Sequence, residues 1–294
     1  MNKEYILEVK NLEYTYGDGT HALKGINLKI EKGKKIAIIG VNGSGKSTLF
    51  LNMNGVLKPS KGDIFFEGEK IAYDKKSLME LRKKVGIVFQ NPETMLFSSN
   101  VYQEVSFGAM NLKLDDDTVH KRVDTALEDV NMTEYSEKSI HFLSYGQKKR
   151  VSIADILVME PELIIFDEPT SSLDPRHTQK IEEIFDELNK KGMTVVISTH
   201  DMNFTYSWAD YIFVIGDGKI KKQGVPEEIF ADDKILEECY LEKPFLFDMF
   251  EKLKEKNLLT NIENYPKTKE ELYKLIKLKE FLRIKDLKIL FLFK

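Results

Sequence analysis

Residues 40–47 read Gly-Val-Asn-Gly-Ser-Gly-Lys-Ser and match the pattern G-x-x-x-x-G-K-[ST], which is typical of a loop that binds phosphate groups. Glycines let successive backbone N–H groups turn toward phosphate oxygens, and the start of the following helix adds a partial positive charge. Lys46 is expected to reach the β- and γ-phosphates, and the Ser47 hydroxyl is a candidate Mg²⁺ ligand. An ordinary glycine-rich turn is the alternative, but it does not require the Lys-Ser pair. The motif therefore predicts a nucleotide site formed by Gly40, Asn42, Gly43, Ser44, Gly45, Lys46, Ser47 and Thr48.

Two carboxylates, Asp167 and Glu168, follow the apolar stretch of residues 163–166. Asp167 is placed to hold Mg²⁺, and Glu168 is placed to orient and polarise a water molecule that attacks the γ-phosphate. The alternative interpretation is that these acidic residues follow a strand only because they favour solubility. The phosphate-binding loop in the same chain favours the catalytic interpretation.

The composition limits the classes of function in which these residues can take part. A hydrophobic fraction of 42% and a charged fraction of 31% over 294 residues are typical of a folded globular protein. The net charge of -4 predicts no nucleic-acid partner. The single cysteine, Cys239, fits a reducing cytosol. No apolar run approaches the roughly 20 residues that a membrane-spanning helix needs, so a membrane role is expected to go through partners.

The reactive residues need a scaffold, and the apolar pattern indicates one. Residues 6–16 and 22–30 alternate apolar with polar side chains, as half-buried antiparallel strands do. Unbroken apolar runs instead predict strands buried on both faces of a parallel sheet. These runs lie at residues 34–39, 163–167, 194–198 and 211–215, and further strands are expected at 62–67 and 85–90.

Helical periodicity is expected in three places. One helix is predicted over residues 175–191, between two strands. Residues 101–159 read as a helical insertion, with helices at 115–130 and 147–159. After Pro226, amphipathic helices are expected at residues 227–259 and 269–282, joined by a loop at 261–266.

Residues 143–147 read Leu-Ser-Tyr-Gly-Gln and precede Lys148-Lys149-Arg150 and a predicted helix. This segment lies between the phosphate-binding loop and the Asp167-Glu168 pair. It resembles the signature Leu-Ser-Gly-Gly-Gln of ABC ATPases, which has the same place in the order of motifs. In that family it faces the nucleotide held by the other subunit of a head-to-tail dimer. The resemblance thus implies ATP contacts for Ser144, Gly146 and Gln147. Tyr145 stands where a second glycine is usual, and a plain helix N-cap at Ser144 is the alternative.

The other family positions are also present. The resemblance implies that the ring of Tyr16 stacks on adenine, although a tyrosine at a sheet edge is the simpler interpretation. It implies that Gln90 senses Mg²⁺ and water, and that His200 contacts the γ-phosphate. Ser172-Leu173-Asp174 matches the segment that crosses the dimer interface, and Asp174 would equally cap a helix. The implied catalytic residues are Glu168, His200, Gln90 and Lys46, and the implied Mg²⁺ ligands are Ser47, Gln90 and Asp167.

The implied fold class is α/β, a P-loop NTPase core of ABC type with an antiparallel β subdomain and an inserted helical subdomain. Residues 1–230 would form the ATPase domain, with the helical subdomain at about 91–160. Residues 231–294 would form a small helical extension. Its apolar side chains must be covered by the ATPase domain, by a second copy of the extension, or by both. Residues 91–100 carry Met95, Leu96 and Phe97, which either pack into the core or form a docking groove for a membrane subunit.

Within the family, the chain is most similar to energy-coupling-factor ATPases of the cobalt-importer type. The similarity lies in Gln-Asn-Pro-Glu at residues 90–93, Met-Glu-Pro-Glu at 159–162, the tyrosine of the signature and the helical extension. Residues 281–294 match nothing in that pattern. The resemblance implies ATP and Mg²⁺ as cofactors and a homodimer or a heterodimer with a second ABC ATPase. It also implies a transmembrane coupling subunit and a substrate-binding membrane subunit, at the cytoplasmic face of a prokaryotic cell membrane.

Three other interpretations stay open at this point. The first is a vitamin importer of the energy-coupling-factor type, since nothing in an ATPase domain touches the cargo. The second is a soluble ABC ATPase that acts on chromosomes or ribosomes. The interval between the loop and the signature is too short for a long coiled coil, and the chain has one ATPase domain rather than two. The third is a degenerate nucleotide-binding scaffold. The presence of Lys46, Asp167, Glu168 and His200 argues against it.

Overall fold

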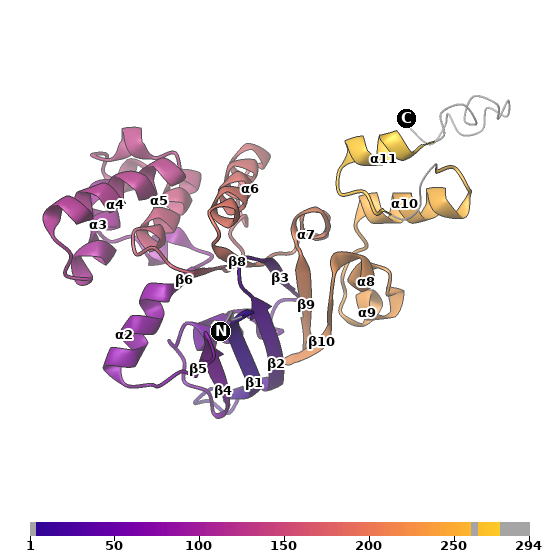
Figure 1. Ribbon diagram of the computed structural model, residues 1–294, viewed down its shortest axis with the longest axis horizontal. Helices are drawn as coiled ribbons and strands as arrows, with labels where there is room; N and C mark the ends of the chain where they lie inside the picture. The colour runs from indigo at the N-terminus through magenta and orange to yellow at the C-terminus, as the bar shows by residue number, and fades with distance from the viewer. Residues whose placement is uncertain (1–3, 260–263, 277–294) are drawn as a thin grey trace.

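The computed structural model describes residues 4–259 and 264–276, and its strands form two sheets (Figure 1). The four-stranded sheet has the order β2-β1-β4-β5 and is antiparallel throughout. Its strands are β1 (Tyr5–Thr15), β2 (His21–Glu31), β4 (Lys61–Phe66) and β5 (Glu69–Lys70). The six-stranded sheet has the order β10-β9-β3-β8-β7-β6. Its strands are β3 (Lys35–Ile39), β6 (Val85–Val88), β7 (Leu163–Phe166), β8 (Thr194–Ser198), β9 (Tyr211–Gly216) and β10 (Lys219–Gly224).

The central strands are apolar on both sides because each face of the larger sheet is covered. In β3, Ala37 and Ile39 pack into one core with the helices, whereas Ile36 and Ile38 pack into a second core with the four-stranded sheet. All four side chains are almost completely buried. Strands β9, β3, β8, β7 and β6 run parallel to one another, and only β10 is antiparallel. The predicted buried parallel strands are confirmed.

The helices up to Trp208 fall into two groups. Four lie among the strands of the two sheets, namely α1 (Lys46–Met53), α2 (Lys75–Lys84), α6 (Pro175–Lys190) and α7 (Met202–Trp208). Three form the predicted helical insertion between β6 and β7, namely α3 (Val101–Asn111), α4 (Asp116–Asp129) and α5 (Tyr145–Leu157). Short 3₁₀ turns lie at Pro92–Thr94, Thr133–Tyr135 and Ile140–Phe142. Helix α5 begins two residues earlier than expected because Ser144 and Gln147 form a capping box at its start.

The single long helix expected over residues 227–259 is wrong. The segment forms three short helices, α8 (Pro226–Phe230), α9 (Asp233–Glu238) and α10 (Phe245–Glu255). The chain breaks after α9 because Tyr240 has a left-handed backbone (φ 52°) and Pro244 cannot continue a helix. Helix α11 (Lys269–Leu275) occupies the first part of the helix expected at 269–282. Ile276 already has an extended backbone and forms a β-bridge with Leu259, and the remaining residues, 277–294, lie outside the described residues.

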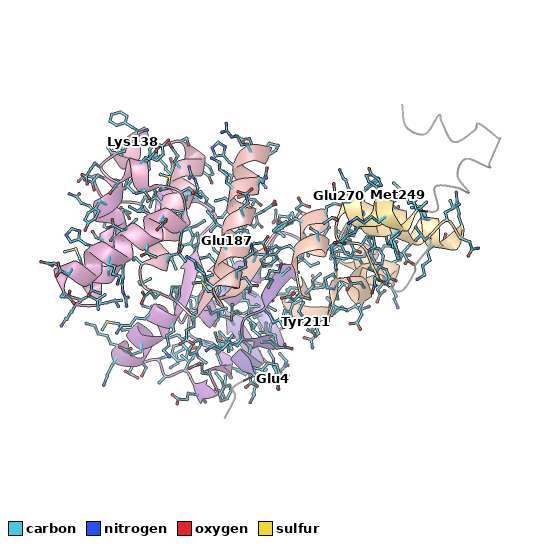
Figure 2. All side chains as sticks on the ribbon, turned by 45° about the horizontal axis from the view of Figure 1, so that its top comes forward. Glu4, Lys138, Glu187, Tyr211, Met249 and Glu270 are labelled. Carbon is cyan, nitrogen blue, oxygen red and sulfur yellow. The ribbon has the colours of Figure 1, made fainter. Side chains whose placement is uncertain are left out.

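The C-terminal helices α10 and α11 lie at the opposite end of the molecule from α3 and α4 (Figure 1). Lys138, in the helical insertion, and Met249 and Glu270, in the C-terminal segment, mark these two ends in Figure 2. Among residues 4–259 and 264–276, no helix combines the length and apolar character needed to cross a bilayer.

Side chains of the C-terminal segment pack on α7. Phe247 is fully buried and meets the ring of Tyr206 edge-on at a centroid distance of 5.5 Å. The Tyr206 hydroxyl donates a hydrogen bond of 2.9 Å to the carbonyl of Pro266. The backbone N–H of Phe245 donates to Asn203 Oδ1 at 2.7 Å. Helix α7 therefore covers part of the apolar surface of this segment, and contact between two copies of the segment stays a prediction.

This packing predicts unequal effects for two phenylalanines on α10. Phe247→Ala is expected to lower the free energy of unfolding by about 3–5 kcal/mol, because it opens a cavity in the core. Phe245→Ala is the matched control, since the ring of Phe245 is 60% exposed. Its effect is expected to stay within about 0.5 kcal/mol. Urea denaturation measures both. Equal losses would contradict the packing of Phe247 against Tyr206 on α7.

Candidate functional site

The phosphate-binding loop connects β3 to α1, as predicted, and two of its glycines are required by geometry. A Cβ at Gly40 would lie 2.1 Å from the carbonyl oxygen of Ile215. Gly45, the N-cap residue of α1, has a φ of 107°, which lies in the region that favours glycine. Strand β9 thus approaches Gly40 too closely for a side chain, and the backbone conformation at Gly45 favours glycine.

The loop presents groups that fit a nucleotide phosphate. No side chain caps the start of α1, so the first N–H groups of the helix are available to an anion. The hydroxyl of Ser44 is buried and has no hydrogen-bond partner within the protein. An unsatisfied buried hydroxyl is costly, and a phosphate oxygen would satisfy it.

Lys46 lies inside the loop and is only 5% exposed. Its Nζ donates to the carbonyl oxygens of Gly40 (2.8 Å) and Val41 (3.2 Å). The same Nζ lies 3.9 Å from Glu168 Oε1. Burial lowers the pKa of Lys46, and the nearby carboxylates of Glu168 and Asp167 oppose that shift. A phosphate in the loop would supply the negative charge that favours the ammonium form.

Asp167 and Glu168 follow β7 directly, and the hydroxyl of Ser198 forms a hydrogen bond with each of them. The Ser198 hydroxyl donates to Asp167 Oδ1 at 2.7 Å and accepts from the backbone N–H of Glu168 at 2.9 Å. Glu168 has a φ of 45°, a conformation that costs energy in a residue with a Cβ and that clusters at functional sites. The sequence analysis missed Ser198, which ends β8 and carries no motif of its own.

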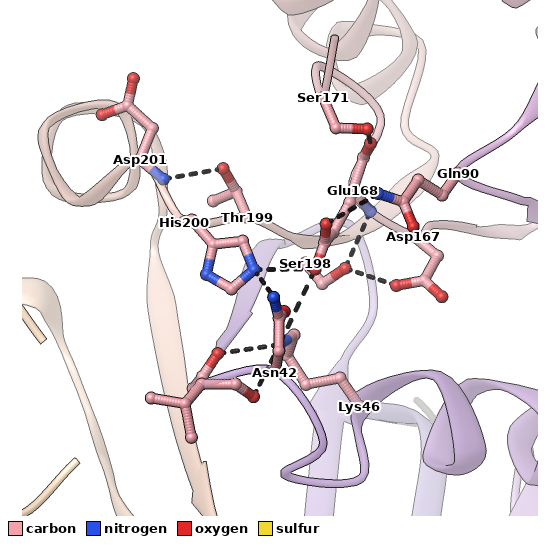
Figure 3. Close-up of polar contacts among 12 residues, drawn as sticks. Asn42, Lys46, Gln90, Asp167, Glu168, Ser171, Ser198, Thr199, His200 and Asp201 are labelled. Carbon is pink, nitrogen blue, oxygen red and sulfur yellow. Dashed lines mark hydrogen bonds and ion pairs between the residues drawn. The ribbon is translucent and has the colours of Figure 1, made fainter. Parts of the chain in front are cut away.

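Two polar side chains from different loops, Gln90 and His200, contact the Glu168 carboxylate, and Asn42 contacts His200 (Figure 3). Gln90 Nε2 donates to Glu168 Oε2 at 3.1 Å. His200 Nε2 lies 2.8 Å from Glu168 Oε1 and 3.0 Å from Asn42 Oδ1, so a proton on Nε2 is shared between these acceptors. Gln90 follows β6, His200 follows β8 and Asn42 belongs to the phosphate-binding loop. The carboxyl ends of adjacent parallel strands therefore bring the predicted residues together.

A cavity of about 560 Å³ opens beside this cluster. Its lining includes most of the predicted nucleotide-binding residues, namely Tyr16, Asn42, Gly43, Gly45, Lys46, Ser47, Thr48, Gln90 and Glu168. The hydroxyl of Tyr16 is 2.9 Å from Thr48 Oγ1, and its side chain is 38% exposed at the mouth of the cavity. The lining also includes Asp217 and Gly218, which the sequence analysis did not select. The Asp-Gly pair was an available signal, because it is typical of the tight turn that joins β9 to β10.

Residues near the cavity also fit Mg²⁺, for which a hydroxyl, an amide oxygen and a carboxylate are suitable ligands. Ser47 and Gln90 line the cavity, and so does Glu168, which directly follows Asp167 in the chain. Asp167 itself is only 7% exposed. Bound Mg²⁺ would supply positive charge to the β- and γ-phosphates, with Ser47, Gln90 and Asp167 as its protein ligands.

The signature segment does not line this cavity. The Ser144 hydroxyl accepts from the backbone N–H of Gln147 at 3.3 Å, and the backbone N–H of Ser144 donates to Gln147 Oε1 at 2.9 Å. A Cβ at Gly146 would lie 2.5 Å from the ring of His177 on α6, so this glycine permits close packing of α5 on α6. Asp174 caps α6 by accepting from the backbone N–H of His177 at 2.9 Å. Within one chain, Ser144, Gly146 and Gln147 are thus placed apart from the phosphate-binding loop.

Comparison with known proteins agrees with this geometry. The family model described as ABC transporter matches residues 23–171. An energy-coupling factor transporter ATP-binding protein EcfA of Methanosphaera stadtmanae is 49% identical over 91% of this chain and 96% of its own length. EcfA3 of Clostridium perfringens is 48% identical over 87% of this chain and 90% of its own length.

Solved structures show the same fold. The structure of cbiO1 from Clostridium perfringens, described as part of the ABC transporter complex cbiONQ, has a TM-score of 0.73 and 48% identity. It covers 84% of this chain and 99% of its own. An ATP-binding cassette in a dimeric post-hydrolysis state with ADP and phosphate has a TM-score of 0.68 and 29% identity, over 75% of this chain and 98% of its own. The predicted α/β fold of ABC type is confirmed. The chain belongs to the ABC transporter family, among the ATP-binding proteins of energy-coupling factor transporters.

Proposed function

We propose that this chain hydrolyses ATP through Glu168 and so powers an energy-coupling factor importer. The observation that supports this most directly is the convergence of Gln90, His200 and Lys46 on the Glu168 carboxylate. In this proposal Glu168 orients the attacking water and accepts its proton, while His200 and Gln90 hold the carboxylate in place. Ser47, Gln90 and Asp167 would hold Mg²⁺, which would supply positive charge near the phosphates, and the ammonium of Lys46 would add to it.

We propose that the complete site needs a second ATPase subunit, either another copy of this chain or a related one. Ser144, Gly146 and Gln147 lie apart from their own phosphate-binding loop, and an N–H-rich helix start is suited to contact the γ-phosphate of a facing subunit. The dimeric state of the related cassette with ADP and phosphate supports this arrangement. Residues 1–230 would be the ATPase domain, with the helical subdomain at 91–160, and residues 231–294 the extension.

We propose cobalt ions as the cargo, with vitamin uptake as the alternative. The resemblance of residues 90–93 and 159–162 to ATPases of the cobalt-importer type supports the first. The description of cbiO1 as part of the complex cbiONQ fits either. The names of the EcfA relatives fit either. The partners would be a transmembrane coupling subunit and a substrate-binding membrane subunit, with the ATPase bound at the cytoplasmic face of a prokaryotic membrane.

Co-purification tests this proposal. The full chain, tagged and expressed in its native cell, is expected to be recovered from the membrane fraction with a transmembrane coupling subunit and a substrate-binding subunit. Uptake of cobalt by cells that lack the chain, compared with uptake of vitamins, distinguishes the two cargoes. Recovery with ribosomes or chromosomal DNA, and without membrane subunits, would contradict the proposal.

We also propose that Phe97 contacts the membrane subunit. Met95 and Leu96 pack against the core, but the Phe97 side chain is 67% exposed. Its ring meets the ring of Phe107 edge-on at a centroid distance of 5.0 Å. Phe107 lines a groove of about 420 Å³, together with Met79, Ile156 and Met159. Exposed aromatic and methionine side chains beside a groove are typical of a surface that receives a partner helix.

The backbone under Phe97 is fixed by a buried side chain. The N–H groups of Phe97 and Ser98 donate to Glu104 Oε2 at 3.0 Å and 2.6 Å. Phe97→Asp is therefore expected to leave the fold and ATP binding of the isolated subunit unchanged but to reduce recovery of the membrane complex at least about tenfold. Tyr273→Asp is the matched control, because Tyr273 is 63% exposed and lies on α11 at the other end of the molecule (Figure 1). Equal complex recovery with both variants would contradict docking at Phe97.

A further inference from the structure

A buried lysine continues the hydrogen bonding of the sheet beyond the end of β6. The last backbone bond between β7 and β6 runs from the N–H of Asp167 to the carbonyl of Val88 at 2.9 Å. The next two carbonyls along the chain belong to Phe89 and Gln90, past the end of the strand. Both accept from Lys149 Nζ, at 2.9 Å and 2.6 Å.

Lys149 lies in the second turn of α5, five residues after Ser144, and is completely buried. Burial of an ammonium group is unfavourable unless polar groups compensate for the lost water. Here burial lowers the pKa of Lys149 to about 8, and the carboxylates of Asp167 and Glu168 oppose the shift. The two carbonyl oxygens compensate directly. The buried ammonium group of Lys149 is thus bound to the backbone carbonyls of Phe89 and Gln90.

Two other side chains from the start of α5 reach the same loop. The hydroxyl of Tyr145 donates to the carbonyl of Gln90 at 3.4 Å. Lys148 Nζ forms an ion pair of 2.6 Å with Glu93 Oε1. The Glu93 side chain is 58% exposed, so this pair contributes little to stability. The tyrosine that departs from the usual signature glycine therefore contacts the carbonyl that Lys149 also holds.

We propose that Lys149, assisted by Tyr145, is a positioning residue that locks the backbone of Gln90 to α5, so that the signature segment and Gln90 move together. The connection runs from α5 through Lys149 Nζ to the carbonyl of Gln90, and from the Gln90 amide to Glu168. A displacement of α5 would shift the amide that holds the Glu168 carboxylate. This inference rests on the catalytic roles proposed above for Gln90 and Glu168.

Lys149→Met tests the inference, because it keeps the length of the side chain and removes the donors. In the full-length chain, kcat for ATP is expected to fall about 10- to 100-fold, the usual effect of displacing a catalytic group by about 1 Å. KM for ATP should change less than about threefold, since Lys149 touches no nucleotide. Amide hydrogen exchange should accelerate at residues 89–95.

Arg150→Met is the matched control on the same helix. Arg150 is also a buried cation, and its Nη1 donates to the carbonyls of Val130 (2.9 Å) and Asn131 (2.6 Å) at the end of α4. This variant should accelerate hydrogen exchange near residues 130–132 and leave kcat within about threefold of the parent chain, since it does not touch Gln90. Comparable kcat values for the two variants would overturn the inference.

Two further variants keep the test decisive. If Lys149→Met does not fold, Lys149→Gln is used, because its side chain ends one atom short of the position of Nζ and carries no charge. Reduced kcat at unchanged KM again supports the inference, and a parental kcat overturns it. Gln90→Ala separates this inference from the proposed function. If Gln90→Ala lowers kcat but Lys149→Met does not, the positioning role fails while the role of Gln90 stands. If Gln90→Ala has no effect, the proposed role of Gln90 fails.

Discussion

Glu168→Gln is expected to slow ATP hydrolysis by about two to four orders of magnitude, the usual scale for loss of a general base. Gln90 and His200 contact different oxygens of the carboxylate, at 3.1 Å and 2.8 Å. The amide oxygen of the variant can still accept from one of them, and its NH2 group can donate to the Gln90 amide oxygen once the Gln90 amide turns over. The position of the side chain should therefore persist. What is lost is the ability to accept a proton from water. Hydrolysis should fail while nucleotide binding remains.

Single-turnover kinetics and a nucleotide-binding assay measure the two effects separately. The variant should also accumulate an ATP-bound dimer, visible as a larger species in size-exclusion chromatography with ATP and Mg²⁺. Glu160→Gln is a suitable control, because the Glu160 side chain is 64% exposed and pairs with Arg122 instead of the site. Hydrolysis by Glu168→Gln at near the parental rate would show that Glu168 is not the base.

Lys46→Ala is expected to weaken ATP binding itself by about one to two orders of magnitude. A hydrogen bond to a charged group contributes about 1.5–3 kcal/mol, and every 1.4 kcal/mol is a factor of about ten in affinity. The substitution also leaves the carbonyls of Gly40 and Val41 without the Nζ donor that they now share. The loop should thus lose both its cation and part of its internal support.

Isothermal titration with Mg²⁺ and ATP measures the affinity directly. Lys61→Ala is the control, since the Lys61 side chain is 72% exposed and pairs with Glu13 on the neighbouring strand. Lys46→Arg should not restore binding, because the broad planar guanidinium does not fit a site in which the lysine is only 5% exposed. Parental affinity in Lys46→Ala would argue against phosphate binding by this loop.

The sequence was most informative where the signal is local. The phosphate-binding loop was predictable because its glycines, lysine and serine are contiguous. Gln90, Asp167 and His200 were predictable as neighbours because each follows a buried parallel strand, and such strands end at one edge of a sheet. The two-residue β5, helix α2, helix α7 and strand β10 were not predicted. Strand β10 reads Lys-Ile-Lys-Lys-Gln-Gly, and as an edge strand with mostly polar residues it has no apolar alternation to detect.

Errors arose where long-range packing decides between local alternatives. Apolar periodicity over residues 227–259 fits one helix, yet the chain turns at Tyr240 and Pro244 so that Phe247 can enter the core beside Tyr206. The alternatives for residues 95–97 were similarly balanced. In the structure they are divided, with Met95 and Leu96 packed inward and Phe97 exposed.

By itself, then, the sequence determined the phosphate-binding loop, the order of the motifs and the buried strands that carry them, because contiguous residues and their periodicity encode these features. Only the tertiary structure decided which groups meet across long separations in the chain. It placed Ser198 between Asp167 and Glu168, His177 against Gly146, and Lys149 beneath Gln90. These contacts depend on how α5, α6 and β8 pack on one another, and no local pattern encodes the distance between side chains on separate elements.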